Sequence, residues 1–102
     1  MINKNLTINP IELKAKINKA EKIQIIDIRE MGIYHNPIPN SEWIPASILL
    51  SNLEKLKKDI PVILYCRLGV DSFCLVNILH SEYQLKNIYS LKSGIEGWNK
   101  LS

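Results

Sequence analysis

Cysteine, glycine and proline are scarce in this sequence of 102 residues, and each scarcity excludes a class of protein. The two cysteines, Cys66 and Cys74, are too few for a disulfide framework and too close together for a metal site with four ligands. Four Gly and five Pro exclude a collagen-like or low-complexity chain. We therefore expect a protein of a reducing compartment, cytoplasmic or in an organelle stroma if organelle-encoded, with no metal and no cofactor.

Long apolar runs and a strong excess of one charge are also absent. The longest nearly apolar stretch, Ile60–Cys66, has the length of a strand, and Met1–Ile8 has neither a basic segment before an apolar run nor a small-residue cleavage site. A net charge of +3 from 13 basic and 10 acidic residues is too balanced to indicate nucleic-acid binding. We expect neither a nucleic acid nor a membrane among the partners.

Arginine is rarer still, because only Arg29 and Arg67 among the 13 basic residues are Arg and the rest are Lys. In a chain rich in Ile, Asn and Lys, arginine is retained where a planar, bidentate guanidinium is needed. The length and a hydrophobic content of 46% suit one globular domain, which we expect to span residues 1–102.

Strand and helix patterns alternate along the chain. Asn9 and Pro10, with Glu12 three residues after the cap, predict a helix start. Nearly continuous β-branched runs are typical of buried parallel strands, so we predict an α/β fold with a mainly parallel sheet. The other predicted elements are a strand over 23–28, at most a short strand near Trp43–Ile44, a helix over 51–58 opened by a Ser51–Glu54 capping box, a strand over 61–66, a loop over 67–71, a helix over 72–81, a strand over 88–91 and a short helix with Trp98.

Cys66 closes the strongest predicted strand, and ligands of open parallel sheets gather at that end of the strands. The loop 67–71 leads directly into a helix, so its backbone N–H groups and the helix N-terminus can converge on the sulfur. Gly69 supplies the backbone freedom that such a tight loop requires. The sequence predicts an anion cradle around a reactive thiolate, whereas the alternative is a small buried residue at a strand end.

Cys74 is predicted to have a different environment. With Leu75, Ile78 and Leu79 it forms an apolar stripe of the predicted helix, so we expect it in the core. From that position it could resolve an oxidised Cys66 only by leaving the core.

Four segments of the chain resemble the rhodanese-like sulfurtransferases. Cys66–Ser72 is similar to the six-residue active-site loop of that family with its following Ser. The other three segments, in the family's order, are Asp27-Ile28-Arg29-Glu30 with Tyr34, Ile38-Pro39-Asn40-Ser41 followed by Ile44-Pro45, and Leu91-Lys92-Ser93-Gly94 with Trp98. The resemblance implies a three-layer α/β/α sandwich in which Cys66 takes sulfane sulfur from a donor as a persulfide and passes it to a nucleophile.

The resemblance also assigns roles to neighbouring residues. The persulfide-binding loop is Arg67, Leu68, Gly69, Val70, Asp71 and Ser72, while Asp27 and Arg29 become structural supports. Arg67 either adds positive potential to the cradle or points outwards to a partner. No imidazole is needed, since His80 lies about 12 Å along the helix from Ser72 and His35, in a proline-rich segment, has a surface or packing role by default.

Asp71 departs from the thiosulfate-using members, which often have a basic residue there. An acid repels the thiosulfate dianion, so the loop looks closer to the rhodanese domain of molybdopterin-synthase sulfurylases, the ubiquitin-activating-like enzymes that load sulfur onto small sulfur-carrier proteins. The implied donor is a cysteine desulfurase persulfide or thiosulfate, and the implied partner is a small ubiquitin-like sulfur carrier or the adenylating enzyme. Since 102 residues cannot hold an adenylation domain, we expect that domain in a separate chain or in a longer parent protein.

Two alternatives stay open at this stage. One is a thiosulfate:cyanide-type sulfurtransferase, and another is a non-catalytic binding module that recruits a partner through the loop and the Trp43 region. Phosphatase chemistry on this fold needs an Arg after five loop residues, where this chain has Ser72. Asn40 and Ser93 stand where the family usually has Gly, which is a mild change for Asn, since it tolerates the left-handed region, and a larger change for Ser.

Overall fold

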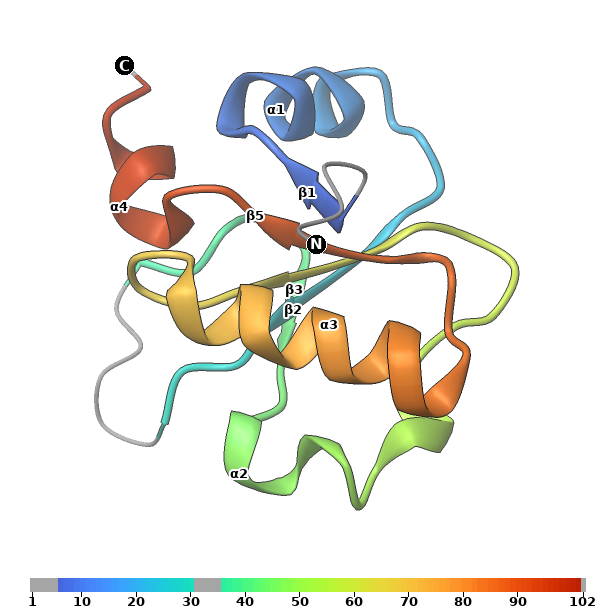
Figure 1. Ribbon diagram of the computed structural model, residues 1–102. Coiled ribbons are helices and arrows are strands. Elements are labelled where there is room, and N and C mark those ends of the chain that lie inside the picture. The colour runs from blue at the N-terminus through green and yellow to red at the C-terminus, as the bar shows by residue number, and fades with distance from the viewer. Residues whose placement is uncertain (1–5, 31–35, 102) are drawn as a thin grey trace.

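Five parallel strands form the centre of the protein in a computed structural model that describes residues 6–30 and 36–101 (Figure 1). The strand order in the sheet is β1-β5-β4-β2-β3, and every neighbouring pair is parallel. The strands are β1 (Thr7–Ile8), β2 (Gln24–Asp27), β3 (Ser41–Trp43), β4 (Val62–Tyr65) and β5 (Ile88–Leu91).

Helices cover both faces of the sheet, with α1 and α4 on one side and α2 and α3 on the other (Figure 1). The helices are α1 (Pro10–Asn18), α2 (Ala46–Leu49), α3 (Val70–Tyr83) and α4 (Gly94–Asn99), with a 3-10 turn at Leu53–Lys55. All residues of β2 and β4 are buried, as expected for strands with both faces covered. The predicted α/β sandwich is confirmed, and the sheet is parallel throughout.

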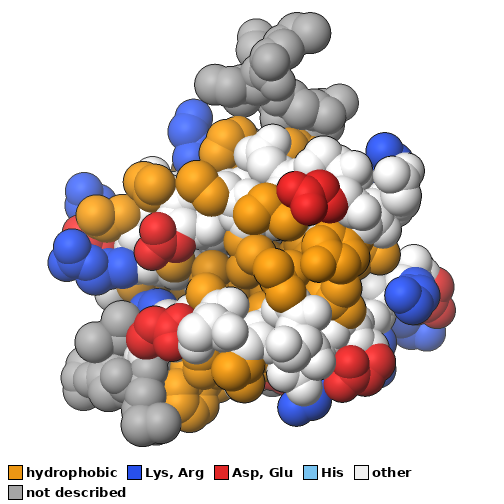
Figure 2. Space-filling model, turned by 60° about the horizontal axis from the view of Figure 1, so that its bottom comes forward, with side chains coloured by type: hydrophobic (Ala, Val, Ile, Leu, Met, Phe, Trp, Pro, Cys, Tyr) orange, Lys and Arg blue, Asp and Glu red, His pale blue; other side chains and the backbone are white. Residues whose placement is uncertain are grey.

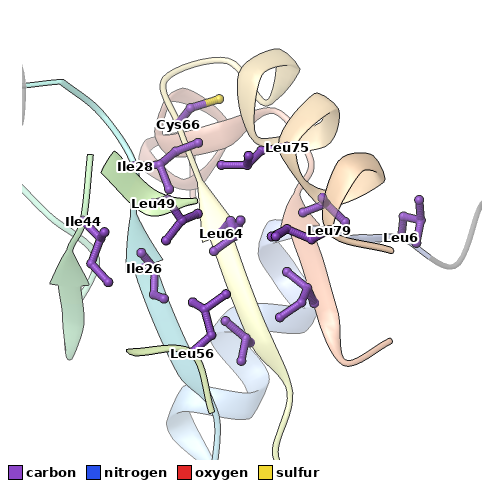
Figure 3. Packing of buried hydrophobic residues seen from close by; sticks show 13 residues of the cluster. Leu6, Ile26, Ile28, Ile44, Leu49, Leu56, Leu64, Cys66, Leu75 and Leu79 are labelled. Atoms are coloured by element: carbon purple, nitrogen blue, oxygen red, sulfur yellow. The ribbon is translucent and has the colours of Figure 1, made fainter. Parts of the chain in front are cut away.

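Two apolar clusters fill the spaces between the layers. The larger one, between the sheet and α2 and α3, is seen from close by in Figure 3. Val62 and Leu64 of β4 belong to this cluster, and Cys66, which follows the strand, lies at its edge. The second cluster joins Leu13 of α1 and Ile95 of α4 to the opposite face of the sheet.

The start of α1 agrees with its prediction. The N–H of Glu12 donates to the side chain of Asn9 at 2.8 Å, and the Glu12 carboxylate accepts from the Asn9 N–H at 3.2 Å. Pro10 occupies the first helical position, where a missing N–H costs nothing.

The predicted helix over 51–58 is wrong. The short α2 ends before this range. It is followed by a turn in which the Ser51 N–H donates to the Ile48 carbonyl, and then by the 3-10 turn. The side chain of Gln24 explains the interruption, because it accepts from the Lys57 N–H and donates to the Lys55 carbonyl, each at 2.8 Å. These contacts to β2 replace the bonds that would have continued a helix.

Helix α3 begins two residues earlier than predicted. Gly69 is its N-cap, in the left-handed region at φ +93°, so Asp71 and Ser72 lie in the first turn rather than at the cap. Strand β1 was not predicted, because its two residues carry no periodic pattern. Within residues 6–30 and 36–101, no helix is long and apolar enough to cross a membrane.

Candidate active site

Cys66 lies immediately after β4, at the carboxyl end of the sheet (Figure 3). Its Sγ accepts hydrogen bonds from the N–H of Gly69 at 3.1 Å and from the N–H of Ser72 at 3.4 Å. The residue is 5% exposed, so these donors act on the sulfur with little competition from water. Two of the backbone donors expected from the sequence therefore meet at the sulfur.

Helix α4 fixes the conformation of the loop after Cys66 through two hydrogen bonds. The carbonyl of Cys66 accepts from the Ile95 N–H at 2.9 Å, and the carbonyl of Arg67 accepts from the Glu96 N–H at 3.1 Å. Gly94, at φ +57°, precedes these donors, and a Cβ atom there would overlap the Cys66 carbonyl oxygen. Sequence reasoning missed this support, although the Gly at position 94 was a visible signal of a close backbone approach.

Gly69 makes the second close approach of the site. A Cβ atom there would lie 2.9 Å from the Ser93 backbone nitrogen, and its φ of +93° is unfavourable for any other residue. The loop after Cys66 therefore packs directly on the backbone between β5 and α4.

A shallow hollow of about 200 Å³ opens at the site, lined by Cys66, Arg67, Leu68, Val70 and Asp71. The side chains of Leu68 and Val70 are 50% and 66% exposed and give it an apolar rim. Asp71 is exposed beside them. The Arg67 guanidinium pairs on the surface with the Glu96 carboxylate at 3.2 Å. Arg67 therefore points outwards instead of toward the sulfur.

Further apolar side chains gather on the face that carries α2 and α3 (Figure 2). Ile48 of α2 and the adjacent Leu50 are 46% and 40% exposed, and Phe73 of α3 is partly buried against the core. This face adjoins the site, because Phe73 follows the first turn of the helix that Gly69 caps.

Cys74 is exposed, so its predicted place in the core is wrong. The face of α3 that packs on the sheet carries Leu75, Val76 and Leu79, and a rotation of about 100° per residue takes Cys74 out of it. The helix is apolar around most of its circumference, and the sequence therefore did not distinguish these two placements.

Asp27 and Arg29 form a buried ion pair near the end of β2. The Arg29 Nη2 and the Asp27 Oδ2 are 2.7 Å apart, and the Tyr65 hydroxyl donates to the same carboxylate at 2.9 Å. Hydrogen bonding to Asp27 raises the pKa of Arg29 against the opposing effect of burial. Burial is the main cause that raises the pKa of Tyr65. Sequence reasoning missed Tyr65, which reads as one more apolar strand residue.

The other polar residues singled out from the sequence lie apart from the sulfur. Glu30 accepts from the Ser47 N–H at 3.1 Å at the start of α2, and His80 Nε2 lies 2.8 Å from the Ile88 carbonyl oxygen. Tyr34 and His35 lie outside the described residues. Over the described ranges, no group of three or more His, Cys, Asp or Glu side chains could hold a metal ion.

The protein is an α/β domain with a buried thiol after the central strand of its parallel sheet. Backbone N–H groups of the following loop and helix donate hydrogen bonds to this thiol. The chain belongs to the rhodanese-like domain family, which it matches over residues 9–101. It is 33% identical over 81 residues to the thiosulfate sulfurtransferase GlpE of Coxiella burnetii, covering 78% of this chain and 75% of that protein. It is also 33% identical over 103 residues to the probable adenylyltransferase/sulfurtransferase MoeZ of Mycobacterium tuberculosis. That match covers 95% of this chain and 25% of MoeZ, so the chain spans about a quarter of the length of this relative.

Solved structures share the fold. A rhodanese-like domain protein of Staphylococcus aureus superposes with a TM-score of 0.80 and 28% identity, over 90% of this chain and 89% of that one. A rhodanese-related protein of Thermoplasma volcanium gives a TM-score of 0.76 and 26% identity, over 92% and 90% of the two chains.

Proposed function

We propose that this protein is a sulfurtransferase that carries sulfane sulfur as a persulfide on Cys66. The observation that carries the proposal is the pair of N–H groups, from Gly69 and Ser72, directed at a buried Sγ. Such donors stabilise negative charge on sulfur whether it is a thiolate or a persulfide anion. The similarity to two proteins named as sulfurtransferases supports it.

Two displacements make up the reaction. The Cys66 thiolate attacks the outer sulfur of the donor, and the donor leaves with the electron pair, as sulfite from thiosulfate or as a thiolate from a desulfurase persulfide. An acceptor nucleophile then attacks the outer sulfur of the persulfide, the S–S bond breaks, and Cys66 leaves as a thiolate. The backbone from Arg67 to Asp71 and the first turn of α3 serve both steps without a base or a metal.

Asp71 bears on the choice of donor. Its carboxylate stands at the rim of the hollow and opposes the approach of the thiosulfate dianion. Because the side chain is exposed, water screens this repulsion to about 1 kcal/mol per charge pair. Thiosulfate, named for the Coxiella relative, then becomes a slow donor, and a cysteine desulfurase persulfide becomes the preferred one.

The acceptor in this proposal is a small ubiquitin-like sulfur-carrier protein activated by an adenylating enzyme. The resemblance of the loop to sulfurylases and the match to MoeZ, an adenylyltransferase/sulfurtransferase by name, support it. The exposed Leu68 and Val70 offer apolar contacts to a polypeptide tail next to the sulfur. With this acceptor the second step differs, because the outer sulfur of the persulfide is the nucleophile: it attacks the activated carbonyl carbon, adenylate leaves, and an acyl disulfide forms on Cys66. A thiol reductant then attacks the Cys66 sulfur, the S–S bond breaks, and the carrier leaves as a thiocarboxylate. A second thiol of the reductant releases Cys66 from the resulting mixed disulfide.

In this proposal the buried ion pair of Asp27 and Arg29 supports the site. Their ion pair and the Tyr65 hydroxyl tie the ends of β2 and β4 together beside the loop. We place all of these parts in one domain that spans residues 1–102.

Thiocyanate formation from thiosulfate and cyanide tests the activity. The wild type is expected to be slow, Cys66→Ser inactive, and Cys74→Ser equal to the wild type because that thiol lies on the outer surface of α3. Activity that survives in Cys66→Ser contradicts the proposed nucleophile. In the alternative of a binding module, Cys66→Ser keeps both partner binding and biological function.

A further inference from the structure

The hydroxyl of Ser90 lies behind the active-site loop without touching the sulfur. Its Oγ is 2.7 Å from Oγ of Ser72, and Ser72 Oγ lies 3.5 Å from Cys66 Sγ. Both serines are buried, at 1% and 0% exposure. Two side-chain oxygens therefore connect the middle of β5 to the nucleophile.

Ser90 is a polar residue at a buried position whose neighbours in the sheet are aliphatic. It pairs in register with Leu64 of β4, two residues before Cys66, and Leu64 belongs to the core between the sheet and α3. Ile88, two residues earlier on β5, packs into the same core. A buried hydroxyl there costs free energy unless it is hydrogen-bonded, and its bond is to Ser72.

The protonation of Cys66 determines which group donates in the hydrogen bond between Ser72 and Ser90. When Cys66 is a thiol, its S–H donates to Ser72 Oγ, and the Ser72 proton is free to point to Ser90. When Cys66 is a thiolate, the sulfur needs a donor, so the Ser72 O–H turns to it. The Ser72 oxygen then accepts from the Ser90 O–H. Both arrangements use the same heavy-atom positions.

The Ser72 hydroxyl has a competing acceptor in the Gly69 carbonyl oxygen. The Gly69 carbonyl oxygen lies 3.4 Å from Ser72 Oγ, so the proton can point there instead of to the sulfur. A donor on the Ser72 oxygen polarises its O–H and strengthens its hydrogen bond to negative sulfur.

We infer that Ser90 is a positioning residue, which directs the Ser72 proton to Cys66 whenever the sulfur is a thiolate. This inference rests on the proposed function for its role in turnover, since Cys66 becomes a thiolate each time the persulfide is discharged. It acts through Ser72 and makes no contact with a substrate.

Alkylation by iodoacetamide tests the inference without any sulfur donor. Mass spectrometry of peptides gives separate rates at Cys66 and Cys74, so exposed Cys74 is an internal reference in every variant. Ser90→Ala is expected to slow Cys66 about three- to tenfold, the range of one hydrogen bond, and to leave Cys74 unchanged. Ser81→Ala, which removes a surface hydroxyl from α3, is the matched control and leaves both rates unchanged.

A double-mutant cycle separates positioning from a general loss of packing. If Ser90 acts through Ser72, then Ser90→Ala has no further effect on Cys66 once Ser72→Ala is present. Ser90→Thr keeps the hydroxyl and is expected to retain the wild-type rate. Equal effects of Ser90→Ala in both backgrounds, or an unchanged rate at Cys66, overturn the inference.

The two proposals fail in different ways. If the wild type accepts no sulfur, the proposed function falls, while the alkylation cycle still reports on the hydroxyl pair. If the wild type accepts and transfers sulfur but Ser90→Ala alkylates at the wild-type rate, the inference on Ser90 falls alone.

Discussion

The carbonyl oxygen of Cys66 accepts a hydrogen bond of 2.9 Å from the N–H of Ile95. This bond joins the nucleophile of the proposed reaction to the last helix, almost thirty residues further along the chain. Because α4 binds the carbonyl groups of Cys66 and Arg67 from outside, the N–H groups of the following residues face the sulfur. The chain after β5 is therefore part of the proposed active site.

Gly94→Ala is expected to damage this junction. The added Cβ overlaps the Cys66 carbonyl oxygen, and the φ of +57° is unfavourable for alanine. We expect a loss of about 3 kcal/mol in the free energy of unfolding, measured by urea denaturation, together with loss of sulfurtransferase activity. Glu96→Ala is the control, since it keeps the N–H to Arg67 and removes only an exposed ion pair worth less than about 1 kcal/mol. A Gly94→Ala protein as stable as the wild type contradicts the described packing.

Ser93→Gly is expected to stabilise the protein. Ser93 holds φ +66° and makes no side-chain capping bond to α4, so it bears the cost of a left-handed residue. Glycine removes about 1 kcal/mol of this cost. Asn40→Gly, at φ +67°, is the comparison and should gain less, because Asn tolerates that region better. Thermal denaturation measures both, and a lower midpoint for Ser93→Gly contradicts the prediction.

Tyr65→Phe is expected to change the stability at alkaline pH. Burial raises the pKa of Tyr65 in the folded protein, so the unfolded chain loses this proton first as the pH rises above about 10. The contribution of Tyr65 to folding stability is therefore fully present below about pH 10. It is lost as the pH rises through the pKa of Tyr65 in the folded protein. The phenylalanine variant is less stable at pH 7, by about 1–2 kcal/mol for the lost hydrogen bonds, and its stability falls less steeply between pH 9 and 11. Tyr83→Phe, at an exposed position, is the control and should keep the wild-type stability at pH 7.

Asp71→Arg is expected to raise turnover with thiosulfate about fivefold, because it replaces a repulsion of the dianion by an attraction across solvent. The gain should shrink at high salt as the charges are screened. Asp59→Arg makes the same charge change before β4, at the other end of that strand from Cys66, and should change little. Slower turnover by Asp71→Arg contradicts this account of donor choice.

The three inner strands, β2, β4 and β5, were predictable because both of their faces are covered. Nearly continuous apolar runs at 23–28, 61–66 and 88–91 each contain a strand of the parallel sheet. The start of α1 was predictable because its cap is local, in Asn9 and Glu12. Where local signals decide the structure, the sequence was sufficient.

The errors arise where distant contacts decide. The capping pattern at Ser51 failed because Gln24 binds the backbone beyond it. Cys74 was misplaced because α3 is apolar around most of its circumference, so periodicity could not select the buried face. The motif at Cys66 was visible from the sequence, whereas its supports at Ile95 and Ser90 depend on how β5 lies beside β4.

The most direct test is mass spectrometry of the protein after incubation with a cysteine desulfurase and cysteine, and separately with thiosulfate. The account predicts a gain of one sulfur atom, mapped to the peptide with Cys66, absent in Cys66→Ser and retained in Cys74→Ser. The persulfide should disappear when cyanide is added. Failure to gain sulfur from either donor, or sulfur that maps to Cys74 instead, contradicts it.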